Sequence, residues 1–194
     1  MAGLTNELAE CQRQFRGNRL EADEICNGLS NREFNLRPAP DRWSVAECLV
    51  HLNITGRTYV ERINSATSRA RDKNMVGKVP YRPGWLARWM IRAMAPPPRR
   101  RYKTPRRFVA PTAEHNVVQV LDEFTLVGEQ WDTCLRAASG LHLARVKVRS
   151  PAVRWLRFPL GALFAMMAAH ERRHLWQARQ VTGPTTFISS EEQR

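Results

Sequence analysis

The sequence contains no hydrophobic run long enough to cross a lipid bilayer. Its longest apolar stretch, PLGALFAMMAA at residues 159–169, is much shorter than the roughly 20 residues that a transmembrane helix needs. The first residues, MAGLTNELAECQRQ, are polar and charged where a secretory signal peptide has its apolar segment. We therefore expect a cytoplasmic protein with no membrane span.

Cysteine is scarce, and the cysteines are not paired in the sequence. They lie in separate segments without a C-x-x-C motif, at Cys11, Cys26, Cys48 and Cys134. This spacing excludes the usual cysteine-based zinc and redox motifs. Most of these cysteines fall on apolar helical stripes, so we expect reduced thiols in the core.

Acidic residues are missing from residues 73–113 and again from residues 133–170, although both stretches contain many arginines and lysines. The first stretch carries most of the net charge of +13. Such runs attract phosphates, anionic lipids or anionic small molecules, but a solvated connecting segment has the same composition. Trp85 and Trp89 make the first stretch aromatic as well as basic. We favour a crossover that packs these tryptophans against the fold over a membrane anchor.

Strand signals are almost absent, since only ARVKVRS at residues 144–150 alternates as a strand does. Instead, apolar residues recur at every third or fourth position in four segments, which predicts amphipathic helices. These segments run from Leu4 to Leu29, from Ser44 to Ile63, from beyond Thr112 to Leu135, and from about Pro159 to Val181. The first stripe is interrupted only at Asn18.

Four amphipathic helices with one long connection predict an all-α four-helix bundle. We assign residues 1–181 to the bundle and residues 182–194 to a C-terminal tail. The basic crossover between the second and third helices spans about residues 65–111, and a short helix within it ends at Pro96. The second helix has a capping box, because Glu47 lies three residues after Ser44.

The fourth helix contains the sequence HERRH, in which His170 and His174 lie one turn apart on one face. This spacing lets two imidazoles reach one metal ion, and the apolar stripe on which both lie makes an unpaired imidazole costly. His51, on the inward edge of the second helix, is the best third ligand. His115 and His142 are expected at the surface, and a pair of core histidines without metal is the alternative.

HERRH also matches the H-E-x-x-H pattern of zinc peptidases. The longer form of that motif fails, because Gln177 and Gln180 stand where its glycine and third histidine belong. A downstream glutamate ligand would have to be Glu191 or Glu192, in the tail, and no credible sheet is available to hold a peptide. We therefore predict that the protein is not a peptidase.

Two segments resemble a known family when they are read together. RPAPDRWSVAECLVHL is similar to the DinB/YfiT-like proline-rich turn followed by a helix with one histidine, and AAHERRHLWQARQV resembles the closing H-x-x-x-H-x-x-Q helix. The resemblance covers the chain from about Leu4 to Val181. It implies a four-helix bundle whose metal is held by His51, His170 and His174, and a metal-dependent hydrolase or an S-transferase that uses a low-molecular-weight thiol.

The leading functional hypothesis is therefore a metal-dependent enzyme whose divalent ion activates water or a thiol. Zinc and nickel are the leading candidates for this ion. Glu171 is a candidate base, or a residue that supports a ligating histidine, but a solvated, salt-bridged Glu171 is equally compatible. Arg88 and Arg92 of the crossover are candidates for binding an anionic small-molecule substrate, with Trp85 or Trp89 anchoring that segment by burial. The alternative is a non-catalytic protein whose crossover binds nucleic acid or an acidic partner. We also expect a homodimer.

Overall fold

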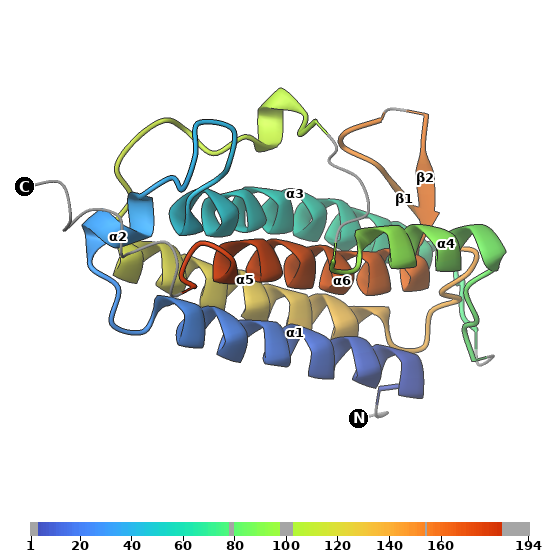
Figure 1. Cartoon of the computed structure of the whole chain (residues 1–194). Helices are drawn as coiled ribbons and strands as arrows, with labels where there is room; N and C mark the ends of the chain where they lie inside the picture. Colours follow the sequence, from blue (N-terminus) through green and yellow to red (C-terminus); the bar gives the residue numbers. More distant parts are fainter. Residues whose placement is uncertain (1–3, 78–79, 98–102, 154, 184–194) are drawn as a thin grey trace, which may run out of the picture.

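The computed structural model describes residues 4–77, 80–97, 103–153 and 155–183. Its main body is a bundle of four long helices (Figure 1): α1 (Asn6–Cys26), α3 (Val45–Asp72), α5 (Val117–Ala138) and α6 (Leu160–Arg179). The predicted all-α four-helix bundle is confirmed. Most of the predicted tail, from residue 184 on, lies outside the described residues.

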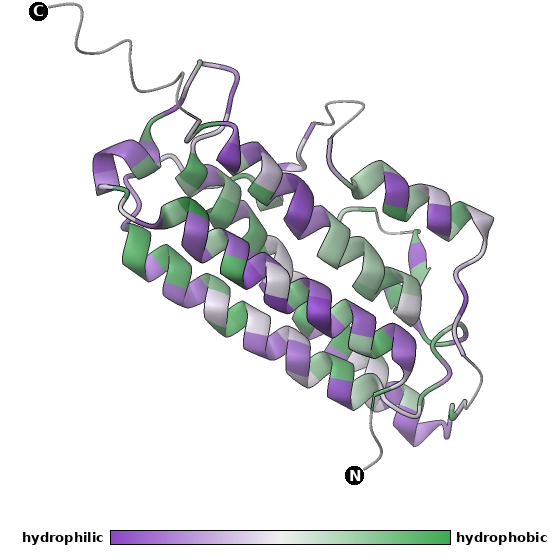
Figure 2. Ribbon diagram, turned by 60° about the horizontal axis from the view of Figure 1, so that its bottom comes forward, coloured by the Kyte–Doolittle hydropathy of each residue, from purple (hydrophilic) through white to green (hydrophobic). Residues whose placement is uncertain are grey.

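Each long helix packs against two others, and the buried hydrophobic residues form two core clusters inside the bundle. α1 packs on α5 and α6, and α3 packs on the same two helices. Figure 2 shows hydrophobic and hydrophilic residues intermixed on the helices of the bundle, as is typical of amphipathic helices. At the centre, Trp131 stacks on Phe15 with ring centroids 4.9 Å apart. All four cysteines are buried and unpaired, as predicted.

The capping box predicted for the second helix is confirmed at the start of α3. The Ser44 side chain accepts from the Glu47 N–H, and the Glu47 carboxylate accepts from the Ser44 N–H. The predicted start of the crossover at about residue 65 is wrong, because α3 continues to Asp72. Its inward stripe extends past Ile63 through small residues, and Ala66 and Ala70 are buried.

Three short elements add to the bundle, two of them strands of a small sheet that was not expected from the sequence. β1 (Lys147–Arg149) lies within the predicted strand-like run and pairs antiparallel with β2 (Arg157–Pro159), which was not predicted. α2 (Asn31–Asn35) was also missed, although Ser30 and Glu33 form a capping box for it. A helix of this length has no hydrophobic period to detect, so only its capping residues could have indicated it.

The crossover contains α4 (Trp85–Met94) and the 3-10 turn η1 (Arg106–Phe108). α4 packs along α6 and ends just before Pro96, as predicted. The prediction that tryptophans anchor this segment is wrong, since Trp85 and Trp89 are 75% and 62% exposed. Met90 and Ile91 pack on the core instead. No helix in the described part of the chain is both long and apolar enough to cross a membrane.

Candidate metal centre

Three histidines from two helices meet between α3 and α6. His51 comes from α3, and His170 and His174 occupy successive turns of α6. One ring nitrogen from each lies within 4.8 Å of the others, and the Nε2 atoms of His51 and His170 are 3.3 Å apart. The structure therefore brings together the three residues that the sequence singled out, and we call them the histidine cluster.

Burial keeps the imidazoles of the histidine cluster neutral. The His51 and His174 side chains are 4% and 9% exposed. Burial, together with His51 and Arg173 nearby, lowers the pKa of His170 to about 3. Burial also lowers the pKa of His174 well below its usual value, and that of His51 against the opposing effect of its hydrogen bond to Phe108. Neutral imidazoles have the lone pairs that metal coordination requires.

A backbone carbonyl from the crossover orients His51. The Nδ1 atom of His51 is 2.7 Å from the carbonyl oxygen of Phe108 in η1. A carbonyl only accepts, so Nδ1 carries the proton and Nε2 presents a lone pair to the cluster. Metal-ligating histidines are commonly held in this way. Nothing in the sequence indicated this contact, because Phe108 acts through its main chain and lies 57 residues away.

Two buried nitrogens of the cluster lack partners. The Nδ1 atoms of His170 and His174 are buried and make no hydrogen bond to any residue that the structure describes. Buried polar groups without partners are rare in folded proteins and mark functional or ion sites. A set of three neutral imidazoles with incomplete hydrogen bonding suits a divalent transition-metal ion.

Trp43 forms an aromatic wall of the histidine cluster. Its ring stacks on His174 with centroids 5.6 Å apart and an interplanar angle of 20°, and it lies tilted on His51 at 5.1 Å. Sequence reasoning did not assign Trp43 to the site. The sequence position of Trp43 could have indicated that it lies at the site. Trp43 directly precedes the capping box and stands eight residues, or about two helical turns, before His51.

Glu171 does not face the histidine cluster. Its Oε1 accepts from the Trp131 indole at 3.0 Å, and its Oε2 accepts from the Asn18 amide at 2.8 Å. The carboxylate thus points toward α1 and α5, while the cluster lies between α3 and α6. The expectation of a solvated Glu171 is wrong, because the side chain is only 4% exposed. Burial raises its pKa to about 8, against the hydrogen bonds from Asn18 and Trp131.

The interruption of the first helical stripe at Asn18 now has an explanation. Asn18 is buried and donates to both the Glu171 carboxylate and the Ala168 carbonyl. A polar residue at this inward position satisfies the buried carboxylate of α6, which an apolar residue could not do. Sequence periodicity detected the anomaly but not its partner, which lies 153 residues away.

The arginines proposed for substrate binding lie on α4 and are exposed. Within the described residues, no hydrogen bond or ion pair joins Arg88 or Arg92 to the histidine cluster. The arginine whose charge acts on the cluster is Arg173 of α6, which also donates to the Ala93 carbonyl at the end of α4. Arg173 directly precedes His174 in the HERRH sequence, so this pattern could have indicated that its charge lies near the cluster.

Comparison with known proteins agrees with this geometry. The family model of the DinB superfamily matches residues 14–178. A solved structure, YfiT from Bacillus subtilis, superposes with a TM-score of 0.60 at 10% identity, covering 93% of this chain and 89% of that one. YfiT is described as a probable metal-dependent hydrolase with an unusual four-helix bundle topology. A search of curated proteins gave no match. On the extent of the family match, this chain is a member of the DinB superfamily.

Proposed function

We propose that the protein is a metal-dependent enzyme whose divalent ion is held by His51, His170 and His174. The observation that carries the proposal is the convergence of three imidazoles within 4.8 Å in the core of the bundle. Nothing in the packing of an ordinary helical bundle requires three neutral imidazoles to face one another with two of their buried nitrogens unpartnered. The description of YfiT as a probable metal-dependent hydrolase supports the same assignment.

Three imidazole ligands are typical of catalytic sites, since they leave coordination positions open for water or substrate. A divalent ion in such a site supplies Lewis acidity that lowers the pKa of a coordinated water or thiol. Zinc and nickel both accept this donor set. We therefore propose hydrolysis, or S-transfer from a low-molecular-weight thiol, with a small and anionic substrate. The unpaired buried thiols support the predicted cytoplasmic location.

The surrounding residues have positioning roles in this proposal. The Phe108 carbonyl holds the His51 ring and its tautomer, and Trp43 covers one side of the cluster. Glu171 was considered from the sequence as a catalytic base. In this proposal it instead holds α6 against α1 and α5. Arg173 adds positive charge beside the cluster, which favours an anionic ligand, while Arg88 and Arg92 stay candidates for binding the distal part of a substrate.

Elemental analysis of protein purified without an affinity tag tests the metal site directly. We expect one divalent ion per chain in the wild type and in His115→Ala, whose histidine lies outside the cluster. His51→Ala and His174→Ala should each lose the ion or bind it far more weakly in competition with a chromogenic chelator. Metal content unchanged in both cluster variants would refute the proposed site.

A second assay separates the two reaction classes. Metal-free, zinc-loaded and nickel-loaded protein should be compared on activated esters and amides, and on an electrophile mixed with low-molecular-weight thiols. Hydrolysis requires metal and no thiol, whereas S-transfer requires both and produces a thioether. If the ion binds but the loaded wild type forms neither product above the level of His51→Ala, the site is not catalytic toward these classes.

A further inference from the structure

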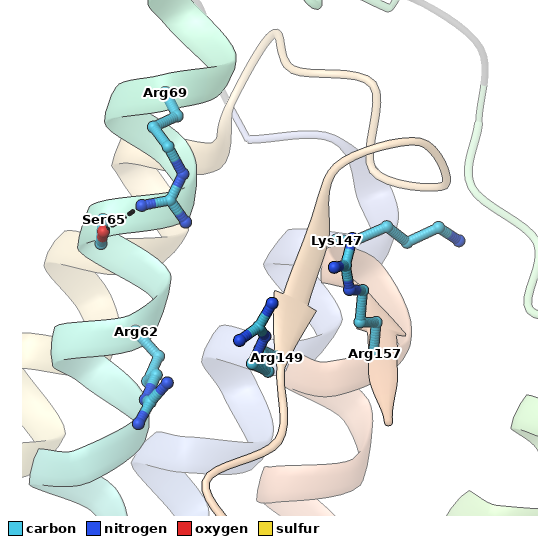
Figure 3. A pocket seen from close by; sticks show the side chains of 6 residues that line it. All are labelled: Arg62, Ser65, Arg69, Lys147, Arg149 and Arg157. Carbon is cyan, nitrogen blue, oxygen red and sulfur yellow. Dashed lines mark hydrogen bonds between the residues drawn. The ribbon is translucent and has the colours of Figure 1, made fainter. Parts of the chain in front are cut away.

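A hollow that is remote from the histidine cluster lies between the C-terminal half of α3 and the β1–β2 hairpin. It has a volume of about 450 Å³, and its lining side chains are Arg62, Ser65, Arg69, Lys147, Arg149 and Arg157. Figure 3 shows the α3 side chains on one side of the hollow and the strand side chains on the other. We call this site the basic pocket. Every lining side chain except Ser65 is cationic, and none is acidic.

The local structure explains why the cations gather here. Arg62, Ser65 and Arg69 follow one another at helical spacing, so they share one face of α3. In the hairpin, Val148 and Phe158 turn inward and are 1% and 6% exposed. Side chains alternate along a strand, so Lys147, Arg149 and Arg157 must lie on the outward face. The second acid-free stretch of the sequence therefore contributes half of one surface site.

Within the hairpin, two cations are placed in direct opposition. Arg149 pairs with Arg157 in the antiparallel register. Like charges opposite each other on neighbouring strands are destabilising, and a two-stranded hairpin has little stability to lose. Such repulsion is offset when an anion binds between the two guanidinium groups.

The described chain provides no carboxylate to neutralise the basic pocket. Other arginines form ion pairs, for example Arg57 with Glu123 and Arg179 with Glu21. In contrast, no ion pair between described residues involves a pocket cation. Arg69 instead donates to the Ser65 hydroxyl, a contact that Figure 3 marks and that orients the guanidinium without reducing its charge.

We propose that the basic pocket binds a compact polyphosphate group, such as the di- or triphosphate of a small molecule. Guanidinium groups bind phosphate oxygens through paired, charge-assisted hydrogen bonds. The pocket volume falls within the range of about 300–1,000 Å³ that is typical of small-molecule sites. Cations that line one hollow suit a compact ligand of high charge, whereas duplex DNA spreads its charges along an extended axis.

The basic pocket and the histidine cluster occupy the same side of α3 but are separate sites. Arg62 lies about three turns after His51, which corresponds to about 16 Å along the helix axis. The loop between β1 and β2 is tied to η1, because Arg107 donates to the Pro151 carbonyl at 2.7 Å. The proposal for the basic pocket does not depend on metal binding and is tested without it.

Isothermal titration calorimetry with sodium tripolyphosphate tests the proposal. The protein should be full-length, tag-free and metal-free, because polyphosphates chelate divalent ions. Pyrophosphate, inorganic phosphate and a short DNA duplex serve as comparison ligands, each at low and at physiological ionic strength. The test variant is Arg149→Gln/Arg157→Gln. The matched control is Arg13→Gln/Arg32→Gln, which removes the same charge from exposed positions on α1 and α2.

We expect saturable binding of one tripolyphosphate, with affinity falling for pyrophosphate and again for phosphate. The test variant should bind at least about tenfold more weakly, since each lost charged hydrogen bond is worth about that factor, and the control should bind as the wild type does. Tripolyphosphate should also raise the melting temperature of the wild type but not of the test variant.

Three results would overturn the proposal. One is equal weakening in the test and control variants, which would show a dependence on net charge alone. Another is tight binding of the DNA duplex without binding of tripolyphosphate, which would assign the surface to nucleic acid. The third is unchanged affinity in a correctly folded test variant. Circular dichroism checks folding, and Lys147→Gln at an exposed strand position replaces the double variant if that one does not fold.

Discussion

Replacing Glu171 tests whether the carboxylate of the HERRH sequence is structural or catalytic. The Trp131 indole and the Asn18 amide both donate to this carboxylate. Glu171→Ala removes both acceptors, so the Trp131 indole N–H and one of the two Asn18 amide N–H groups lose their partners while the other keeps its bond to Ala168. Glu171→Gln keeps one carbonyl for the indole, and Asn18 can turn its amide to accept from the new side chain at the loss of its bond to Ala168.

The magnitudes follow from the hydrogen bonds. Each unsatisfied buried donor lowers the free energy of unfolding by about 1–3 kcal/mol. Part of this loss is offset, because the variant no longer bears the cost of burying the Glu171 carboxylate away from water. We expect Glu171→Ala to lower the free energy of unfolding by about 2–4 kcal/mol, which corresponds to a melting temperature lower by about 5–15 °C for a chain of this size. Glu171→Gln should stay within about 1–2 kcal/mol of the wild type, the value of one exchanged hydrogen bond.

Urea unfolding of metal-free protein, followed by far-ultraviolet circular dichroism, measures these differences. Metal affinity of the folded variants is measured in parallel by chelator competition, and we expect Glu171→Gln to bind metal as the wild type does. A Glu171→Ala variant as stable as the wild type would refute the structural role. A stable Glu171→Gln that binds metal but loses all turnover would restore the role of base.

The remaining predictions concern stability and specificity. Ser44→Ala removes the side-chain cap of α3 and should cost about 0.5–2 kcal/mol, measured by urea unfolding; no loss would show that the cap is dispensable. Gly56→Ala places a Cβ 2.5 Å from Cγ1 of Val127, so overpacking of about 1–3 kcal/mol should exceed the helix-propensity gain of about 1 kcal/mol. Its control, Gly17→Ala, meets nothing within 4 Å and should stabilise α1 in the same assay; the reverse order would contradict the packing argument. Zinc-loaded protein should not cleave casein, because the described part of the chain has only the short β1–β2 pair and no substrate-holding sheet; cleavage that Glu171→Gln abolishes would identify a peptidase.

Local patterns in the sequence were sufficient for the bundle and for the histidine cluster. Helical periodicity reports which side of each helix is buried, and this alone assigns His51, His170 and His174 to inward faces. The capping box at Ser44 also depends only on neighbouring residues. Predictions of this kind succeed because the interactions behind them lie within one or two turns of helix.

Boundaries and weak elements were less predictable for the same reason. α3 extends past Ile63 because Ala66 and Ala70 are buried in the hydrophobic core, but alanines give little periodic signal. β2 contains three residues and is stabilised by pairing with β1, so its own sequence does not indicate a strand. Burial of Trp85 and Trp89 was predicted from residue type, yet α4 turns Met90 and Ile91 toward the core.

The contacts that give the sites their chemistry depend on packing between distant segments. The Phe108 carbonyl reaches His51 across 57 residues, and Asn18 reaches Glu171 across 153. The basic pocket joins residues 62–69 of α3 to a hairpin that follows α5. Periodicity along one helix shows which side chains point inward, but not which carbonyl, amide or guanidinium meets them there. Those partners are set by how the helices and the hairpin pack together, and therefore only by the tertiary structure.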